Sequence, residues 1–253
     1  MLKYLRYILL VIPRVIGAYF AWMIKYARHP ERYPFEVRYQ RVRELVLFIF
    51  RHFRVDIHIE GREFYLQGPR PFVIYANHVS YVDPLLLIAM SEKPISFVAK
   101  KESLSYPFIG KVMRILEGVA IDRANLRSQI VAMDRAVKMI ENGRSIAIFP
   151  EGTRNRHPEL GLNEFKPGAF KLSYRTGAPI IACAFYGTDR PLSMKSKLKS
   201  YPLWVRFFEP IAKNEFLQFS TVDMASQVRL KIQTEINNVM KPNDCSLLKK
   251  ADK

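Results

Sequence analysis

Residues 72–84 read Phe-Val-Ile-Tyr-Ala-Asn-His-Val-Ser-Tyr-Val-Asp-Pro, and three leucines follow them. The β-branched and aromatic residues at the start of this stretch predict a buried strand. Asp83 followed by Pro84 predicts the N-cap and the first residue of a helix. A strand that leads directly into a helix is typical of a parallel sheet, in which helices connect successive strands.

Similar apolar runs recur after residue 55 and alternate with stretches of helical periodicity. Apolar residues spaced as on one helix face run from Leu126 to Ile140, and Gly143 follows as a C-cap. A second helix is expected to begin after Ser220 and to end at Pro242. The pattern predicts an α/β fold with a largely parallel mixed sheet flanked by helices. The expected strands lie at 55–59, 72–75, 95–99, 119–121, 146–149, 180–185 and 204–208.

Composition and patterning divide the chain into three expected segments. The chain is 49% hydrophobic and 25% charged over 253 residues, which excludes disorder as its main state. Residues 1–56 are expected to form an N-terminal helical arm, and residues 57–242 the α/β domain. Residues 243–253, with lysines near their end, are expected to form a disordered basic tail.

The charge balance limits the classes of partner. The chain has 40 Lys and Arg against 23 Asp and Glu, a formal net charge of +17, so its partners are expected to be anionic. Nucleic acid, a phosphorylated substrate, an acidic protein and an anionic membrane all satisfy that condition. Two cysteines are too few for a disulfide framework or a cysteine-rich metal site.

The N-terminal arm carries an apolar run from Tyr7 to Ile24 that is interrupted by Arg14. An arginine near the middle of a span costs roughly 2.5–3.5 kcal/mol on insertion scales, which disfavours crossing the membrane. Together with a second apolar block at 45–50 bracketed by arginines, the run predicts a pair of helices in the membrane interface. An amphipathic hairpin buried against the domain has the same periodicity and remains the alternative.

His78 lies at the end of the predicted strand, and Asp83 follows at the start of the predicted helix. If the turn folds Asp83 back onto His78, the carboxylate holds one ring nitrogen protonated and leaves the other free as a general base. Ser80 lacks the glycines of a nucleophile elbow, so the base is expected to act on a hydroxyl of the substrate. The alternative is purely structural: Asp83 caps the helix and His78 is an ordinary turn residue.

Charged residues end two further strands. Phe149-Pro150-Glu151-Gly152-Thr153-Arg154 follows one strand, and Gly118 to Arg123 includes another. In the first, Gly152 allows a close approach of the backbone to a ligand, and Arg154 suits bidentate binding of a phosphate. Because the carboxyl ends of parallel strands share one edge of a sheet, these groups are expected to meet His78 there.

These blocks resemble those of the glycerolipid acyltransferase family, most closely its bacterial lysophosphatidic acid acyltransferases. Asn77-His78 through Asp83 is similar to the family's Asn-His-x4-Asp block, and Phe149 to Arg154 is similar to its Phe-Pro-Glu-Gly-x-Arg block. The block at 118–123 is also similar to one of the family's blocks, a weak match lies at 178–181, and the resemblance covers about residues 60–212. It implies transfer of a fatty acyl group from a thioester to the sn-2 hydroxyl of lysophosphatidic acid, which makes phosphatidic acid.

The resemblance also implies roles for individual residues. His78 would be the general base and Asp83 would orient it, while Arg123 and Arg154 would hold the acceptor's phosphate. The other expected substrate-binding residues would shape that site or assist at the phosphate or the oxyanion: Glu151, Gly152, Thr153, Lys100 and Lys101. No metal and no cofactor are expected, since acyl-CoA or acyl carrier protein brings the acyl group as a co-substrate.

Two alternatives of different classes remain at this level. An acyltransferase for glycerol 3-phosphate or another lysolipid fits the same blocks. A non-catalytic basic module that binds a membrane or nucleic acid fits the charge alone, but no nucleic-acid signature is evident, so no nucleic-acid partner is expected. The arm predicts a peripheral or monotopic protein on the cytoplasmic leaflet of the cell membrane.

Overall fold

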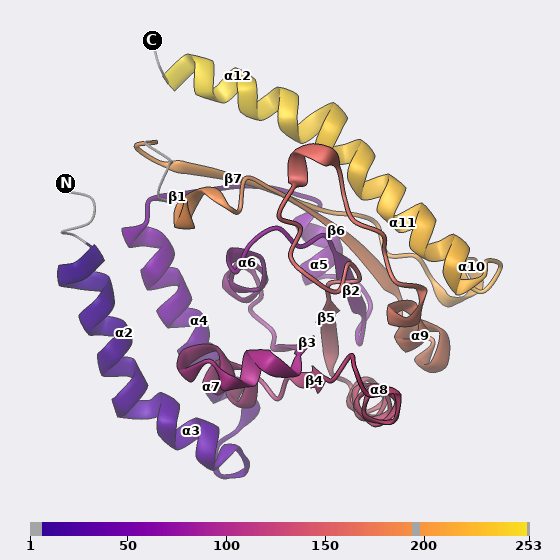
Figure 1. Cartoon of the computed structure of the whole chain (residues 1–253), viewed down its shortest axis with the longest axis horizontal. Coiled ribbons are helices and arrows are strands. Elements are labelled where there is room, and N and C mark those ends of the chain that lie inside the picture. The colour runs from indigo at the N-terminus through magenta and orange to yellow at the C-terminus, as the bar shows by residue number, and fades with distance from the viewer. Residues whose placement is uncertain (1–6, 194–197, 252–253) are drawn as a thin grey trace.

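A seven-stranded sheet forms the centre of the computed structural model, which describes residues 7–193 and 198–251 (Figure 1). The strand order is β1-β7-β6-β2-β5-β3-β4. Neighbouring strands are parallel except β6 and β7, which are antiparallel. The predicted largely parallel mixed sheet is therefore confirmed. Its strands are β1 (Val55–Glu60), β2 (Val73–Ala76), β3 (Ile95–Lys100), β4 (Val119–Ile121), β5 (Ser145–Ile148), β6 (Ile180–Tyr186) and β7 (Tyr201–Phe207).

Helices cover both faces of the sheet, so its central strands are apolar on both sides. Successive side chains of a strand point to opposite faces, and Ile74 belongs to one apolar cluster while Val73 and Tyr75 belong to the other. The first cluster includes α4 (Phe35–His52), α5 (Arg62–Leu66), α6 (Val82–Met90) and α7 (Pro107–Ile115). The second includes α8 (Leu126–Glu141), α9 (Pro167–Thr176), α10 (Lys213–Phe216) and α11 (Thr221–Glu235). Short 3-10 turns lie at Pro30–Arg32, Lys101–Ser105, Pro158–Leu160 and Arg190–Leu192.

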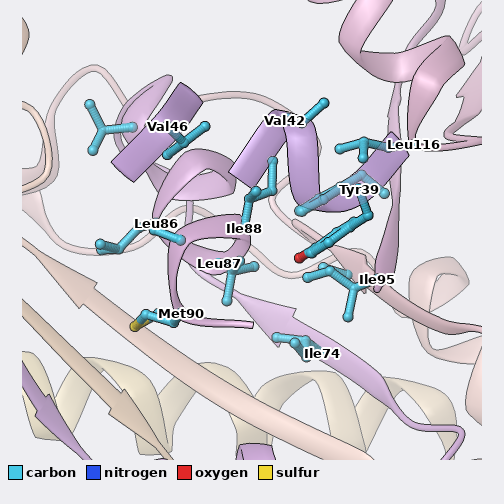
Figure 2. Close-up of a cluster of buried hydrophobic side chains, with 14 of the residues drawn as sticks. Tyr39, Val42, Val46, Ile74, Leu86, Leu87, Ile88, Met90, Ile95 and Leu116 are labelled. Atoms are coloured by element: carbon cyan, nitrogen blue, oxygen red, sulfur yellow. The ribbon is translucent and has the colours of Figure 1, made fainter. Parts of the chain in front are cut away.

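Helix α6 is buried between α4 and the sheet. Figure 2 shows Val42 and Val46 of α4 above Leu86, Leu87 and Ile88 of α6, with a strand of the sheet below. Burying apolar side chains on both sides of α6 contributes on the order of 1.5–3 kcal/mol per large residue. This packing fixes the helix that carries Asp83 against the end of β2.

The N-terminal arm is helical from Tyr7 to Arg28 and then turns back into α4. Its helical segments are a π-helical turn (Tyr7–Val11), α2 (Ile12–Ala18), a second π-helical turn (Tyr19–Met23) and α3 (Ile24–Arg28). Arg38 of α4 is buried and ion-paired with Glu117, which also pairs with Arg144 at 3.1 Å, so the arm is fixed to the domain. The first six residues of the expected arm lie outside the described residues.

The outer side of the arm is apolar and exposed. Leu9, Ile12, Ile16 and Phe20 all expose about half or more of their surface, as membrane-facing residues would. Leu9–Arg28 is 20 residues long and is the one helix in the described residues that has the length and composition to cross a membrane. The apolar helix indicates association with a membrane.

The C-terminal end differs from the expectation. The expected helix end at Pro242 and the expected disorder are wrong for residues 243–251, because the chain continues from α11 through a π-helical turn (Ile236–Met240) into α12 (Lys241–Ala251) (Figure 1). The last two residues of the expected tail, 252–253, lie outside the described residues. Asp244 explains this order: its buried carboxylate accepts two hydrogen bonds of 2.6 Å from Arg190 and one of 3.1 Å from Trp204. Pro242 comes directly after the π-helical turn, as the second residue of α12.

Candidate active site

His78 follows the carboxyl end of β2, and Asp83 lies in the first turn of α6. The turn between them brings His78 Nδ1 to 2.7 Å from Asp83 Oδ2. The same oxygen accepts hydrogen bonds from the backbone N–H groups of Val79 (2.7 Å) and Ser80 (2.8 Å). Asp83 was expected to be the N-cap and Pro84 the first helical residue, but α6 begins two residues earlier, at Val82, and the Asp83 carboxylate binds the amides of the preceding turn.

The geometry of the His78 ring matches what a general base needs. Its Nδ1 bonds to a carboxylate, so Nδ1 carries the proton and Nε2 has the free lone pair. No group of the described residues bonds to Nε2, and the side chain is 18% exposed. The ring stacks on Phe149 at the end of β5, with centroids 4.2 Å apart and planes at 22°. His78 is thus fixed in orientation while one nitrogen remains available.

The loop after β5 holds the main chain of His78 from both sides. Glu151 Oε1 accepts a hydrogen bond of 2.6 Å from His78 N–H, and Asn155 N–H donates one of 2.6 Å to His78 C=O. The other carboxylate oxygen of Glu151 accepts from the backbone N–H of Asn163 at 3.1 Å. Burial raises the pKa of Glu151, and these amides oppose the increase. Glu151, expected to bind substrate, instead bonds to backbone amides with both of its oxygens.

Asn77 extends the pairing of β2 with β6 beyond the last strand residue. Its side-chain Nδ2 donates to Phe185 C=O at 2.9 Å, and its Oδ1 accepts from Phe185 N–H at 2.7 Å. Asn77 is fully buried. Neither Asn155 nor Asn77 was predicted to position His78, since their partners are far away in the sequence.

Arg154 packs its guanidinium over the ring of Tyr81, 3.7 Å from the centroid, on the loop that joins His78 to α6. Gly152 adopts φ +76°, a conformation that other residues rarely take, so glycine is required in this turn. Thr153 between them is exposed. The structure therefore brings Gly152 and Arg154 close to His78.

The predicted cations at the ends of β3 and β4 have contacts different from those of Arg154. Lys100 is 3.4 Å from Glu102, and Lys101 is 2.5 Å from Asp122, so both lysines have carboxylate partners. Arg123 lines a cavity of about 400 Å³ to which Phe149 and Gly152 also contribute, whereas Arg154 does not line it. Burial lowers the pKa of Arg123, and Glu102 opposes that change. The two arginines expected at one phosphate thus lie in different surroundings.

The part of the chain that the structure describes has no candidate metal site. No cluster of three His, Cys, Asp or Glu side chains there has an arrangement that would hold an ion. The chemistry that the arrangement supports is proton transfer by His78, with cationic side chains around it.

Comparisons with known proteins agree on one family. Residues 56–186 match the family model described as Acyltransferase. The probable 1-acyl-sn-glycerol-3-phosphate acyltransferase of Mycoplasma pneumoniae is 31% identical over 241 residues, which cover 88% of this chain and 85% of that protein. The 1-acyl-sn-glycerol-3-phosphate acyltransferase of Borreliella burgdorferi is 36% identical over 117 residues, 46% of each chain.

A solved structure has the same fold. The crystal structure of the 1-acyl-sn-glycerophosphate (LPA) acyltransferase PlsC from Thermotoga maritima superposes with a TM-score of 0.70 at 21% identity, and the match covers 94% of this chain and 98% of that one. The family model spans both the His78 turn and the loop that holds it. The resemblance seen in the sequence is confirmed, and this chain belongs to the acyltransferase family.

Proposed function

We propose that this enzyme transfers a fatty acyl group from a thioester donor to the sn-2 hydroxyl of lysophosphatidic acid and so makes phosphatidic acid. The hydrogen bond between His78 Nδ1 and Asp83 Oδ2, with Nε2 left open, carries the proposal. The names of the relatives support the choice of acceptor. Because this chain belongs to an enzyme family, the alternative of a basic binding module without catalytic activity is disfavoured.

The proposed reaction needs one base and no protein nucleophile. His78 Nε2 takes the proton of the acceptor hydroxyl as its oxygen attacks the thioester carbonyl, and Asp83 stabilises the imidazolium that forms. The carbon–sulfur bond then breaks, and the imidazolium returns the proton to the leaving thiolate. The products are the acyl ester and a free thiol, so the step is balanced.

Arg154 is the cation best placed for the acceptor's phosphate. Its stacking on Tyr81 holds the guanidinium beside the turn that carries His78, and a planar guanidinium binds a phosphate through two hydrogen bonds. Thr153 is exposed next to it and has a hydroxyl that suits the same group. The acceptor hydroxyl and its phosphate would then lie on the same side of the base.

The arm would hold the enzyme on the cytoplasmic leaflet as a monotopic protein. Leu9, Ile16 and Phe20 present an apolar surface, while the guanidinium of Arg14 lies 5.7 Å from the ring of Phe48 in α4. Anionic lipid attracts basic residues near its surface by about 1 kcal/mol each. A lysolipid acceptor would then reach the site from the membrane, and a soluble donor would reach it from water.

A panel assay tests the proposal. Purified full-length protein in detergent is offered lysophosphatidic acid, glycerol 3-phosphate, other lysolipids and a neutral monoacylglycerol, each with acyl-CoA and with acyl carrier protein thioester. We expect phosphatidic acid as the main product and a poor rate with monoacylglycerol, which lacks the phosphate. Faster transfer to glycerol 3-phosphate or to another lysolipid would contradict the proposed acceptor.

A further inference from the structure

The loop between β5 and α9 holds the main chain of His78, and this loop is long. It runs from residue 149 to residue 166 and contains the 3-10 turn Pro158–Leu160. Connections of this length are mobile unless other elements fix them. The contacts of the loop with His78 come from the side chain of Glu151 and the backbone N–H of Asn155. The groups that hold the loop in place therefore also determine where the base lies.

Two hydrogen-bonded routes lead from His78 into the second half of the loop. Asn163 N–H donates to Glu151 Oε2 at 3.1 Å, while Glu151 Oε1 accepts from His78 N–H at 2.6 Å. Asn155 Nδ2 donates to Gly161 C=O at 2.6 Å, while the backbone N–H of Asn155 donates to His78 C=O at 2.6 Å. Glu151 and Asn155 are buried, so the loss of either bond would leave a buried polar group without its partner. The second half of the loop thus supports both contacts of the His78 main chain.

Helix α11 binds this second half through two side chains. Arg229 and Gln233 are four residues apart and therefore lie on one face of the helix. Arg229 Nε donates to Asn163 C=O at 2.9 Å, and Arg229 Nη2 donates to Leu162 C=O at 2.5 Å. Gln233 Oε1 accepts from Leu162 N–H at 2.6 Å. Three backbone groups of the loop are therefore bonded to α11, directly beside the residues that contact Glu151 and Asn155.

The two side chains of α11 are themselves oriented. Gln233 Nε2 donates to Asn237 Oδ1 at 3.2 Å, and Lys241 Nζ donates to the same oxygen at 2.9 Å. The amide oxygen of Gln233 is therefore directed toward the loop. No carboxylate of the described residues lies within ion-pair distance of Arg229, so its guanidinium is available to the loop carbonyls. Leu162 is buried in the same apolar cluster as α11, which adds packing to these bonds.

We infer that Arg229 and Gln233 are positioning residues for the general base His78. They act through Glu151 and Asn155, and neither of them bonds to His78 itself. The inference rests on the proposed function, in which His78 Nε2 takes the proton of the acceptor hydroxyl. A misplacement of about 1 Å at a catalytic group costs up to roughly 10²-fold in rate. A loosened loop should therefore lower kcat more than it changes the KM of either substrate.

Substitutions that keep the length of the side chain but remove its hydrogen bonds test the inference in the full-length protein. Gln233→Met and Arg229→Met should each lower kcat for transfer to lysophosphatidic acid about tenfold. Gln233→Glu keeps an acceptor oxygen for Leu162 N–H and should restore most of the parent's kcat. The matched controls are Gln227→Met and Lys231→Met, exposed residues of the same helix that line a surface groove, and both should behave as the parent.

Amide hydrogen exchange reports on the loop without any reaction. Gln233→Met and Arg229→Met should speed exchange about tenfold in peptides that cover residues 149–166 and 72–84, and the two control variants should not. Faster exchange with the parent's kcat would show that α11 only braces the fold, and the inference would be wrong. Unchanged exchange in both variants would overturn it as well. If the parent transfers no acyl group to lysophosphatidic acid, the proposed function fails, while the exchange rates still decide whether α11 holds the His78 turn.

Discussion

At the scale of single residues, His78 is held at three points and open at one. Asp83 binds Nδ1, Glu151 binds the backbone N–H and Asn155 binds the backbone C=O, all within 2.7 Å. The first contact orients the ring and the other two hold the main chain, and none of them uses Nε2. Preorganisation of this kind lowers the cost of placing a base at the reacting hydroxyl.

A substitution at Asp83 distinguishes a role in catalysis from a role that only stabilises the turn. Asp83→Asn keeps an oxygen for the turn amides but loses control of the tautomer and stabilisation of the imidazolium, so kcat should fall by roughly 10²-fold or more. Asp56→Asn, in a His–Asp pair at 3.4 Å outside the site, is the matched control and should keep the parent's kcat. A lower melting temperature with an unchanged kcat in Asp83→Asn would show that Asp83 only stabilises the turn before α6.

Glu151 predicts a pH dependence of stability. Burial raises the pKa of its carboxyl above 4.5 in the folded state, so ionisation there disfavours folding. The free energy of unfolding of the parent minus that of Glu151→Gln should therefore fall as the pH rises from about 4.5 through the folded-state pKa, and then level off. Urea denaturation at several pH values measures this difference. A difference that increases over the same range would show that the folded protein favours the ionised form.

At the scale of elements, the carboxyl ends of the strands position the site. His78 follows the end of β2, the loop after β5 binds its main chain, and Arg123 follows the end of β4. The sheet register that places β2 beside β5 and β6 is what brings Glu151 and Phe185 to the His78 turn. The site is therefore a property of the strand order as much as of the individual motifs.

The last helix is fastened by one buried ion pair. Asp244 of α12 binds Arg190 through two hydrogen bonds and Trp204 of β7 through a third. Asp244→Ala leaves the mostly buried Arg190 without its partner and should lower the free energy of unfolding by about 3 kcal/mol. Asn243→Ala, at the exposed neighbouring position, is the control for the change in helix propensity. Equal losses in the two variants, measured by urea denaturation, would contradict the role given to the pair.

The local sequence pattern predicted the strands and helices well. It failed where contacts between residues far apart in the sequence determine the structure. All seven strands overlap the predicted apolar runs, and the capping box at Ser220 and Asp223 starts α11 as expected. The predicted helix end at Pro242 failed because Arg190, 54 residues from Asp244, orders the next helix. Likewise, the contact of Glu151 with His78 spans 73 residues, and no spacing within either motif indicates it.

At the scale of the whole molecule, the proposed function gives the arm the task of bringing the enzyme to a lipid substrate. One side of the arm packs on α7 and the sheet, and the other side is apolar and exposed. The arm packs on the domain as the hairpin interpretation expects, and its exposed apolar side is compatible with the interfacial interpretation, which stays a prediction.

The topology of the arm gives a further prediction. In sealed vesicles of both orientations, tags at the two termini should both be cleaved by protease from the cytoplasmic side alone, because Arg14 disfavours a crossing. An N-terminal tag cleaved from the opposite side would show that Leu9–Arg28 spans the membrane.

The central claim is that His78 is the general base of acyl transfer to lysophosphatidic acid. The most direct measurement is kcat for the full-length parent and for His78→Ala with lysophosphatidic acid and a thioester donor, on protein whose melting temperature shows that it is folded. Loss of a general base should reduce kcat by roughly 10²- to 10⁴-fold, with little change in the KM of either substrate. A His78→Ala variant with kcat within about threefold of the parent would contradict the account, since general acid–base catalysis contributes far more than that.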